Sequence, residues 1–475
     1  MKLVNGSIWT GDGFARGEVA IDGNRIAHTS DDARVIDLRG RFVVPGFIDN
    51  HTHFIDGGFQ LSRVQLRDTQ SPAEIAERIA AHARTLGPGK WVTGGSWDLQ
   101  PDRALIDAMT PDNPVFVQRL DMHMGLANAR ALAQAGITRE THDPPGGAIA
   151  RDADGEPTGL LKDAAMSAMY AVIPKPSLEE RVLAVRAALR EAGRCGVTSL
   201  CDLQIREEPD DLRAYQQVEL TTRIHLYTPI TSPERLRYAT PRLRLAGLKG
   251  FSDGSLGSST AAMFEPFDDD PTNRGLMMQE MEDGSIARWV EEADANDIQI
   301  ALHAIGDRAN DAVLTLFESR PNTRARRFRI EHAQHLNAEL VQRFARSGVI
   351  ASMQPYHAVE DGRWSHTRIS GERAKWMYAF RALLDAGAIV TFGSDWTVAP
   401  LDPLTGIRAA MDRGVTFAEA LRCYTSNNAY ALFRDHELGR IAPGMLADLA
   451  VLSSDRVEDA RVEMTIMDGE IVYES

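Results

Sequence analysis

The sequence predicts an α/β protein built around a (β/α)8 barrel, with a β-sandwich domain and an insertion added to it. Eight short runs of apolar or β-branched residues alternate with longer helical patterns, as is typical of a parallel sheet covered by helices. The length of 475 residues suits one large domain with an extra module. Both ends of the chain are rich in turn residues, which predicts the β-sandwich domain. A long segment between the first and second of these runs also departs from the alternation, which predicts the insertion.

The predicted barrel strands are short runs that contain apolar or β-branched residues. In chain order they are GFIDNHTH, GVTSLCDL, TRIHLYT, LKGFSDGS, IQIALHAIGD, RFRIEHAQ, VIASMQPY and IVTFGSDW. Helical patterns cover residues 177–196, 287–297 and 380–388 between these runs, and they end near Gly or Asp as helices commonly do. Eight such strand segments predict a TIM-like barrel.

Residues 1–45 and 441–475 both contain short alternating runs broken by Gly and Asp turns, which predicts strands. Because the two ends of a domain commonly lie close together, we expect these segments to form one small β-sandwich domain. The barrel is then predicted over residues 46–440, with a subdomain inserted at about residues 54–190.

Composition limits the expected partners. Lys and Arg total 52 against 67 Asp and Glu, so the net charge of −15 disfavours nucleic acid and anionic membranes as partners. The amino terminus shows no signal-peptide core, and no run is long enough to span a membrane. With three cysteines, too few for a disulfide framework, a cytoplasmic location is expected. The expected partner is a small-molecule substrate.

His51 and His53 are two residues apart at the end of the first predicted barrel strand, so their side chains share one face. Such a pair by itself is common in surfaces and cores. Active sites of (β/α)8 proteins lie at the carboxyl ends of the strands, and chemically suitable residues recur there in later segments. These residues are Lys249, His303, His332 and Asp395. Four His and one Asp suit a divalent ion of the zinc or manganese kind.

These motifs resemble those of the amidohydrolase superfamily of metal-dependent hydrolases. The residues that carry the resemblance are PGFIDNHTHF, Lys249, His303, His332 and Asp395, together with GMLADLAVL near the end. The phrases FSDGSLGSSTA, LHAIGDRAND, RIEHAQ and GSDWTVAPLDPL, with the insertion, are similar to the amidohydrolase-3 branch, which includes N-substituted formamide deformylase-like enzymes. The resemblance covers nearly the whole chain.

The resemblance implies one or two divalent metal ions, zinc first, and N6-carboxylysine at Lys249. A carbamate would supply two anionic oxygens where a free ammonium beside two cations is disfavoured. The alternatives are an unmodified Lys249 beside a single ion, or an ion pair of Lys249 with Asp253. The implied ligands are His51, His53, Lys249 and Asp395 for one ion, and Lys249, His303 and His332 for the other.

The same resemblance implies cleavage of a C–N bond in an amide, N-acyl or N-formyl group. Metal-bound hydroxide would attack the carbonyl, and Asp395 would shuttle the proton to the leaving group. Deamination of a cyclic amidine and hydrolysis of an ester or carbamate are alternatives on the same centre. A non-catalytic structural protein of the same fold is a further alternative, and association as a homodimer is expected by analogy.

Candidate substrate contacts lie in other polar motifs of the barrel and the insertion. They are Trp97, Asp98, His123, Arg308 and His357. A buried, hydrogen-bonded histidine or a tryptophan packed in the core is an equally simple interpretation of such residues. Trp364 and Trp376 are open to the same two interpretations. Cys201 lies in an apolar strand and is expected to be inert core.

Overall fold

The computed structural model of the chain describes residues 1–29, 34–97, 99–119, 124–144, 147–204, 209–231 and 239–475. The chain forms two compact units. One consists of Met1–Gly57 with Ala188–Ser475, and the other of Gly58–Ala187.

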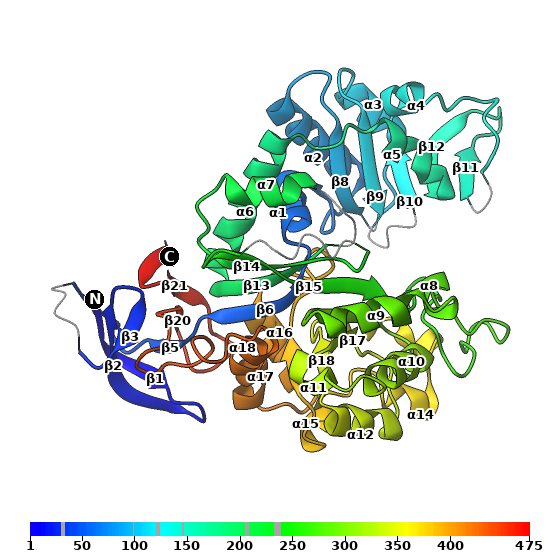
Figure 1. Cartoon of the computed structure of the whole chain (residues 1–475). Coiled ribbons are helices and arrows are strands. Elements are labelled where there is room, and N and C mark those ends of the chain that lie inside the picture. Colours follow the sequence, from blue (N-terminus) through cyan, green and yellow to red (C-terminus); the bar gives the residue numbers. More distant parts are fainter. Residues whose placement is uncertain (30–33, 98, 120–123, 145–146, 205–208, 232–238) are drawn as a thin grey trace. The chain divides into compact units, whose positions relative to one another are not determined.

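The predicted (β/α)8 barrel is present in the first unit, which confirms the fold class (Figure 1). Eight parallel strands pair in chain order, so that each strand neighbours the next along the sequence. They are β6 (Phe47–Thr52), β13 (Val197–Leu203), β14 (Arg223–Pro229), β15 (Leu243–Phe251), β16 (Gln299–Ala304), β17 (Arg329–His332), β18 (Ile350–Met353) and β19 (Val390–Phe392). Each corresponds to one of the eight predicted runs.

The barrel closes where β6 meets the segment that follows β19. Thr52 forms a parallel bridge with Trp396. The backbone N–H of Asp395 donates to the carbonyl oxygen of His51 at 2.7 Å, and that of His53 donates to the carbonyl oxygen of Trp396 at 2.6 Å. Closure therefore brings the two ends of the barrel sequence, with His51 and Asp395, into direct contact.

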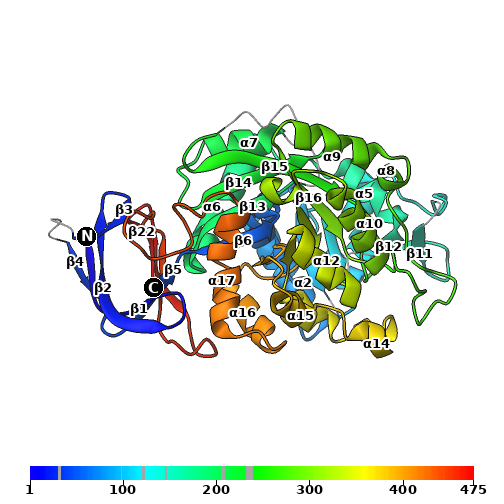
Figure 2. The same cartoon turned by 60° about the horizontal axis from the view of Figure 1, so that its bottom comes forward.

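Helices of the first unit alternate with the barrel strands and surround them (Figure 2). They are α7 (Pro209–Gln216), α8 (Gln279–Glu282), α9 (Ser285–Ala295), α10 (Asp307–Glu318), α11 (Thr323–Arg326), α12 (Ala338–Ser347), α13 (His357–Asp361), α14 (Gly371–Ala374), α15 (Phe380–Asp385), α16 (Pro403–Met411), α17 (Phe417–Cys423) and α18 (Ser426–Ala431). Among the described residues, no helix has the length and apolar character needed to cross a membrane.

Local sequence signals explain where these helices start and stop. The Asn337 side chain caps α12 by accepting from the backbone N–H of Leu340, and α12 ends at Gly348 in the left-handed conformation. Thr416 and Glu419 form a reciprocal capping box at the start of α17. Such caps satisfy the backbone groups that a helix leaves unpaired at its ends.

Strands from both ends of the chain share one sheet in the first unit, with the order β22-β21-β20-β5-β1-β2-β3 and with β4 paired to β1. The strands are β1 (Lys2–Trp9), β2 (Phe14–Asp22), β3 (Arg25–Ala27), β4 (Val35–Asp37), β5 (Phe42–Pro45), β20 (Leu449–Leu452), β21 (Val462–Met467) and β22 (Glu470–Glu474). Leu3, Val43, Leu449 and Ile466 are fully buried in its core, so residues from the two ends stabilise each other.

The second unit, Gly58–Ala187, contains a six-stranded sheet of its own with the order β11-β12-β10-β9-β8-β7. Its strands are β7 (Val64–Gln65), β8 (Val92–Trp97), β9 (Val115–Arg119), β10 (Met124–Ala127), β11 (Gly147–Arg151) and β12 (Pro157–Asp163), and its helices are α2 (Pro72–Leu86), α3 (Arg103–Met109), α4 (Ala129–Gln134) and α5 (Ser167–Val172). Along the chain, α1 (Phe54–Ser62) and α6 (Leu178–Arg194) run across the boundaries between the units.

Candidate metal centre

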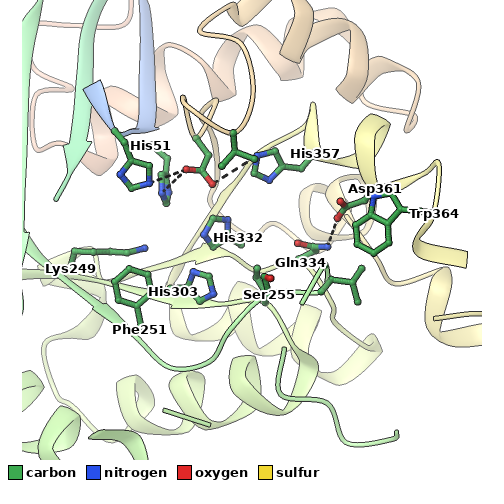
Figure 3. A pocket seen from close by; sticks show the side chains of 16 residues that line it. His51, Lys249, Phe251, Ser255, His303, His332, Gln334, His357, Asp361 and Trp364 are labelled. Atoms are coloured by element: carbon green, nitrogen blue, oxygen red, sulfur yellow. Dashed lines mark hydrogen bonds and ion pairs between the residues drawn. The ribbon is translucent and has the colours of Figure 1, made fainter. Parts of the chain in front are cut away.

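The six residues predicted as metal ligands come together at the carboxyl ends of five barrel strands. They line one cavity of about 340 Å³ in the first unit (Figure 3). The residues are His51 on β6, His53 just after it, Lys249 on β15, His303 on β16, His332 on β17 and Asp395 after β19. His357, predicted as a substrate contact, lines the same cavity from the start of α13.

Asp395 lies between two groups of histidines. His51, His53 and Asp395 each offer a ligand atom within 4.8 Å of the other two, and so do His332, His357 and Asp395. The Nε2 atom of His53 is 3.1 Å from Asp395 Oδ1, and that of His51 is 3.6 Å from it. This spacing allows the three side chains to bind a single ion.

Each of the two histidines from the first strand has its other ring nitrogen fixed by an acceptor. His51 Nδ1 bonds Glu331 Oε2 at 2.6 Å, and His53 Nδ1 bonds the carbonyl oxygen of Leu203 at 2.8 Å. A carboxylate or carbonyl oxygen can only accept, so both Nδ1 atoms carry the hydrogen. The Nε2 atoms are therefore the ring nitrogens that face Asp395 and that could bind a metal ion in place of a proton. Acceptors of this kind orient metal-binding histidines in general.

The other two histidines are anchored in the same way. His332 Nδ1 lies 2.8 Å from Gln354 Oε1, and His303 Nε2 lies 2.9 Å from the carbonyl oxygen of Gly254. Their ring centroids are 4.5 Å apart. Each ring again keeps one nitrogen available, so the four histidines fit the donor set that a divalent metal ion requires.

A buried ionic network supports His51 from inside the barrel. Glu331 and Arg329 are both fully buried and bonded to each other, and the Ser352 hydroxyl donates to Glu331 Oε2 at 2.8 Å. Burial alone raises the pKa of Glu331, but Arg329 and His51 outweigh it and hold that pKa well below its usual range. Glu331 is therefore a carboxylate that fixes the His51 ring.

Glu331 is a functional residue that was not predicted from the sequence, although the motif RIEHAQ contains it next to His332. Strand alternation places Arg329 and Glu331 on one face of β17, and that face is the barrel interior. The available signal was a pair of opposite charges at i and i+2 in a predicted barrel strand, because buried charges occur paired.

Lys249 brings a buried amine to the cluster, with Nζ 4.8 Å from the centroid of the Phe251 ring. Its side chain is 2% exposed, and its Nζ atom has no hydrogen-bond partner. Burial is the main cause that lowers its pKa to about 8. Asp253, considered as an ion-pair partner, instead accepts backbone N–H groups from Ala262, Ile305 and Gly306. An orphaned buried nitrogen among metal-type ligands fits a site completed by an ion or by modification of the lysine.

The charge states of the cluster also suit a metal ion. Burial lowers the pKa of His303 to about 3 and lowers that of His332 well below the usual value, so both rings are neutral at pH 7. Burial opposes ionisation of Asp395, but His51 and His53 outweigh it and hold its pKa well below the usual range. Neutral imidazoles beside a carboxylate are the ligand forms that zinc binds.

Two of the cluster residues have unusual backbone conformations. His332 has φ of 73° and Asp395 has φ of 57°, in the left-handed region that residues other than Gly rarely adopt. Such strain concentrates at functional sites and persists only where surrounding contacts enforce it. Here the bond from the Asp395 N–H to the His51 carbonyl oxygen is one such contact.

The other predicted substrate contacts that the structure describes do not line this cavity. Trp97 is buried in the core of the second unit, where its Nε1–H donates to the Val117 carbonyl oxygen at 3.2 Å. Arg308 lies on α10, outside the residues that line the cavity. Asp98 and His123 lie outside the described residues.

Cys201 is a buried free thiol on β13, as expected for inert core. Burial raises its pKa to about 11. At neutral pH it is therefore protonated and a weak nucleophile.

A (β/α)8 barrel with histidines and a carboxylate gathered at the carboxyl ends of its strands defines a class of protein, the metal-dependent barrel hydrolases. A model of the amidohydrolase family (Amidohydro_3) matches residues 34–473. The chain belongs to the amidohydrolase family, in its amidohydrolase-3 branch.

Similar proteins come from a plant, a bacterium and an archaeon. The protein LONG AFTER FAR-RED 3 of Arabidopsis thaliana is 36% identical over 535 residues, covering 100% of this chain and 91% of the plant protein. The N-substituted formamide deformylase of Arthrobacter pascens is 28% identical over 543 residues, covering 100% of this chain and 98% of the enzyme. A crystal structure of an uncharacterized metal-dependent hydrolase from Pyrococcus furiosus superposes with a TM-score of 0.79 at 27% identity, covering 96% of this chain and 99% of that one.

Proposed function

We propose that this hydrolase cleaves a C–N bond in a small amide, N-acyl or N-formyl compound, with Asp395 as the proton shuttle. The observation that carries the proposal is the convergence of four anchored histidines, Lys249 and Asp395 on one cavity. The similarity to an enzyme named N-substituted formamide deformylase supports N-formyl compounds as the first class to test.

We propose zinc as the metal, because neutral imidazoles with a carboxylate are typical zinc ligands. His51, His53 and Asp395 would hold one ion, and His303 and His332 a second, with Lys249 shared between them. A bound ion of this kind polarises a carbonyl group and makes water acidic enough to attack it near neutral pH.

The side chains around the cluster supply the proton transfers. Asp395 is ionised, so it can accept a proton from the attacking water and then pass it to the leaving nitrogen. The buried His357 Nε2 has no hydrogen-bond partner and lies 3.9 Å from Asp395 Oδ2. A donor at this position can stabilise the oxyanion that forms when the carbonyl is attacked.

We also propose that Lys249 is carboxylated. Its amine would add to carbon dioxide, forming an N–C bond and releasing one proton, to give a carbamate with two anionic oxygens. The burial and missing partner of Nζ support this, because the cavity offers the ammonium no compensating hydrogen bond.

Labelling tests the carbamate directly. Protein incubated with ¹³C-bicarbonate should show a carbamate carbon signal by NMR, and the Lys249→Arg variant should lack it. A spectrum without that signal in the metal-loaded wild-type protein would leave Lys249 as an unmodified amine.

The proposed reaction is tested by assaying metal-loaded protein with N-formyl and N-acyl amines and identifying the products. Release of the free amine with formate or the acid supports C–N hydrolysis. Ammonia released from cyclic amidines would instead identify a deaminase, and turnover confined to esters or carbamates would exclude the amide assignment. Metal-loaded protein that hydrolyses none of these classes would favour the non-catalytic alternative.

For the cellular setting we propose the cytoplasm and a homodimer. The three free thiols, all buried, support a reducing compartment. Light scattering of the purified protein measures the oligomeric state, and fractionation of the producing cells measures the location.

A further inference from the structure

The wall of the cavity away from the histidines carries a second group of polar side chains. Gln334 follows β17, Asp361 ends α13, and Trp364 comes three residues later. Figure 3 shows Asp361 and Trp364 on the far side of the cavity from His51 and Lys249. These residues are not needed for the proposed hydrolysis step.

Asp361 is only partly satisfied by its neighbours. The Tyr378 hydroxyl donates to Asp361 Oδ2 at 2.5 Å, and the Gln334 Nε2 group donates to the same oxygen at 2.9 Å. No described residue donates a hydrogen bond to the other oxygen, Oδ1. One carboxylate oxygen at the cavity wall is thus available to a ligand.

The amide of Gln334 is oriented by this contact. A carboxylate oxygen can only accept, so the amide nitrogen must face Asp361 and the amide oxygen must face away from it. Figure 3 shows that oxygen turned toward the interior of the cavity. No described residue donates to it, so Gln334 offers a second acceptor on the same wall.

Besides these acceptors, the cavity lining includes the His357 Nε2 atom, which has no hydrogen-bond partner, and the Ser255 hydroxyl. The Ser255 hydroxyl is 2.8 Å from the Ser258 hydroxyl, and either of the two can donate to the other. Trp364, Leu256 and Val398 contribute apolar surface to the cavity lining. A ligand group that bonds both Asp361 Oδ1 and Gln334 Oε1 must bring its own N–H donors, and the apolar residues suit a planar or apolar body.

We propose that this wall selects substrates whose end remote from the scissile bond carries a protonated amine or amidine. The proposal rests on the proposed C–N hydrolysis, for which it names the substrate class. Two N–H groups of such a cation can bond Asp361 Oδ1 and Gln334 Oε1 together, and the positive charge pairs with the carboxylate. Burial raises the pKa of Asp361, so a bound cation would also favour its ionised form.

A matched pair of substrates tests this inference. The two compounds are an N-formyl aromatic amine with a remote aminomethyl group and its analogue with an ethyl group there. We expect wild-type protein to prefer the cation by about 30-fold or more in kcat/KM, as for a buried charge pair. In Asp361→Asn, which keeps the shape but removes the charge, this ratio should fall close to one.

Glu372→Gln is the control for a general charge effect, because it removes an acid that lies outside the cavity and is paired with Lys375. The preference ratio should be the same in this variant as in wild type. Equal rates for the two compounds in wild type, or a preference that survives Asp361→Asn, would overturn the inference.

A binding measurement separates this inference from the proposed reaction. Calorimetry with the deformylated diamine and with its ethyl analogue, on the metal-loaded protein, reports recognition without turnover. If the diamine binds more tightly than its ethyl analogue and Asp361→Asn abolishes this difference, recognition of the cation by Asp361 and Gln334 is supported even if no N-formyl compound is hydrolysed. If N-formyl compounds are hydrolysed but the two amines bind equally well, the proposed reaction stands and the proposed recognition of a cation is wrong.

Discussion

The two ends of the cavity are built differently. At the histidine end, His51 is 1% exposed and its ring is held by Glu331, itself fully buried inside the barrel. At the opposite end, Asp361 and Trp364 are only partly buried and lie on a short helix and the connection after it. The ends of barrel strands provide rigid positions for reacting groups, whereas connections between elements vary more freely. We infer that the strands determine the reaction and the connections determine the substrate.

The largest effect should come from the proton shuttle at the histidine end. In Asp395→Asn we expect kcat to fall by about 10³-fold, because the proton acceptor is lost while the shape is kept. Stopped assays with the best N-formyl substrate measure this. A variant that retains wild-type kcat would remove Asp395 from the mechanism.

The next largest effect concerns His357, which lies beside Asp395. In His357→Asn we expect kcat to fall by about 100-fold, as for the loss of one donor to the oxyanion, with metal content unchanged. Elemental analysis alongside the kinetics decides between two roles. Loss of an ion in this variant would show that His357 is a ligand, as its grouping with His332 and Asp395 allows.

Loss of the Glu331 carboxylate, which holds the His51 ring, should lower both the stability of the protein and its affinity for metal. In Glu331→Gln we expect the free energy of unfolding to fall by about 3 kcal/mol, because Arg329 is left as an uncompensated buried charge. Metal affinity should fall about 10- to 100-fold because the His51 ring loses its anchor. Urea unfolding of the metal-free proteins and titration with zinc measure the two effects.

A surface ion pair provides the contrast for that variant. Glu156→Gln breaks the pair with Arg139, in which both side chains are about half exposed, and we expect it to change the unfolding free energy by only about 0.5 kcal/mol. Similar losses in the two variants would contradict the difference inferred between buried and exposed charges.

The pH dependence of stability gives an independent test of Glu331. Its folded-state pKa is depressed, so its stabilising contribution is present above its unfolded pKa of about 4.3 and is lost as the pH falls toward the folded value. Wild-type protein should therefore lose stability more steeply below about pH 4.3 than Glu331→Gln does. Parallel curves for the two proteins would show that Glu331 is not ionised in the fold.

The smallest effect should come from the opposite end of the cavity. Tyr378→Phe removes one donor to Asp361 but keeps the carboxylate. We expect KM for the cationic substrate to change by about 5-fold or less, in line with the net value of one hydrogen bond. A loss as large as that of Asp361→Asn would mean that the Tyr378 bond, and not the charge, determines recognition.

Much of the fold and of the histidine cluster could be predicted from the sequence. Short apolar or β-branched runs with helical patterns between them indicate the barrel, because this alternation is typical of a parallel sheet covered by helices. His51 and His53 share a face through strand periodicity alone, and Lys249, His303 and Asp395 stand at the ends of other predicted strands. Barrel geometry then implies that these strand ends meet.

Only the tertiary structure decided which side chains support the cluster and what lies opposite it. The Glu331 carboxylate reaches His51 because β17 and β6 enclose the same interior, a contact between residues 280 positions apart in the chain. Gln334 and the Tyr378 hydroxyl both donate to Asp361 Oδ2, and these two bonds leave Asp361 Oδ1 and Gln334 Oε1 as acceptors on the same wall of the cavity. The periodicity of the sequence determines which face of a helix or strand a residue occupies. Contacts between elements depend on how these elements pack against each other. Packing therefore decides that Glu331 holds His51 and that Gln334 and Asp361 form the opposite wall of the cavity.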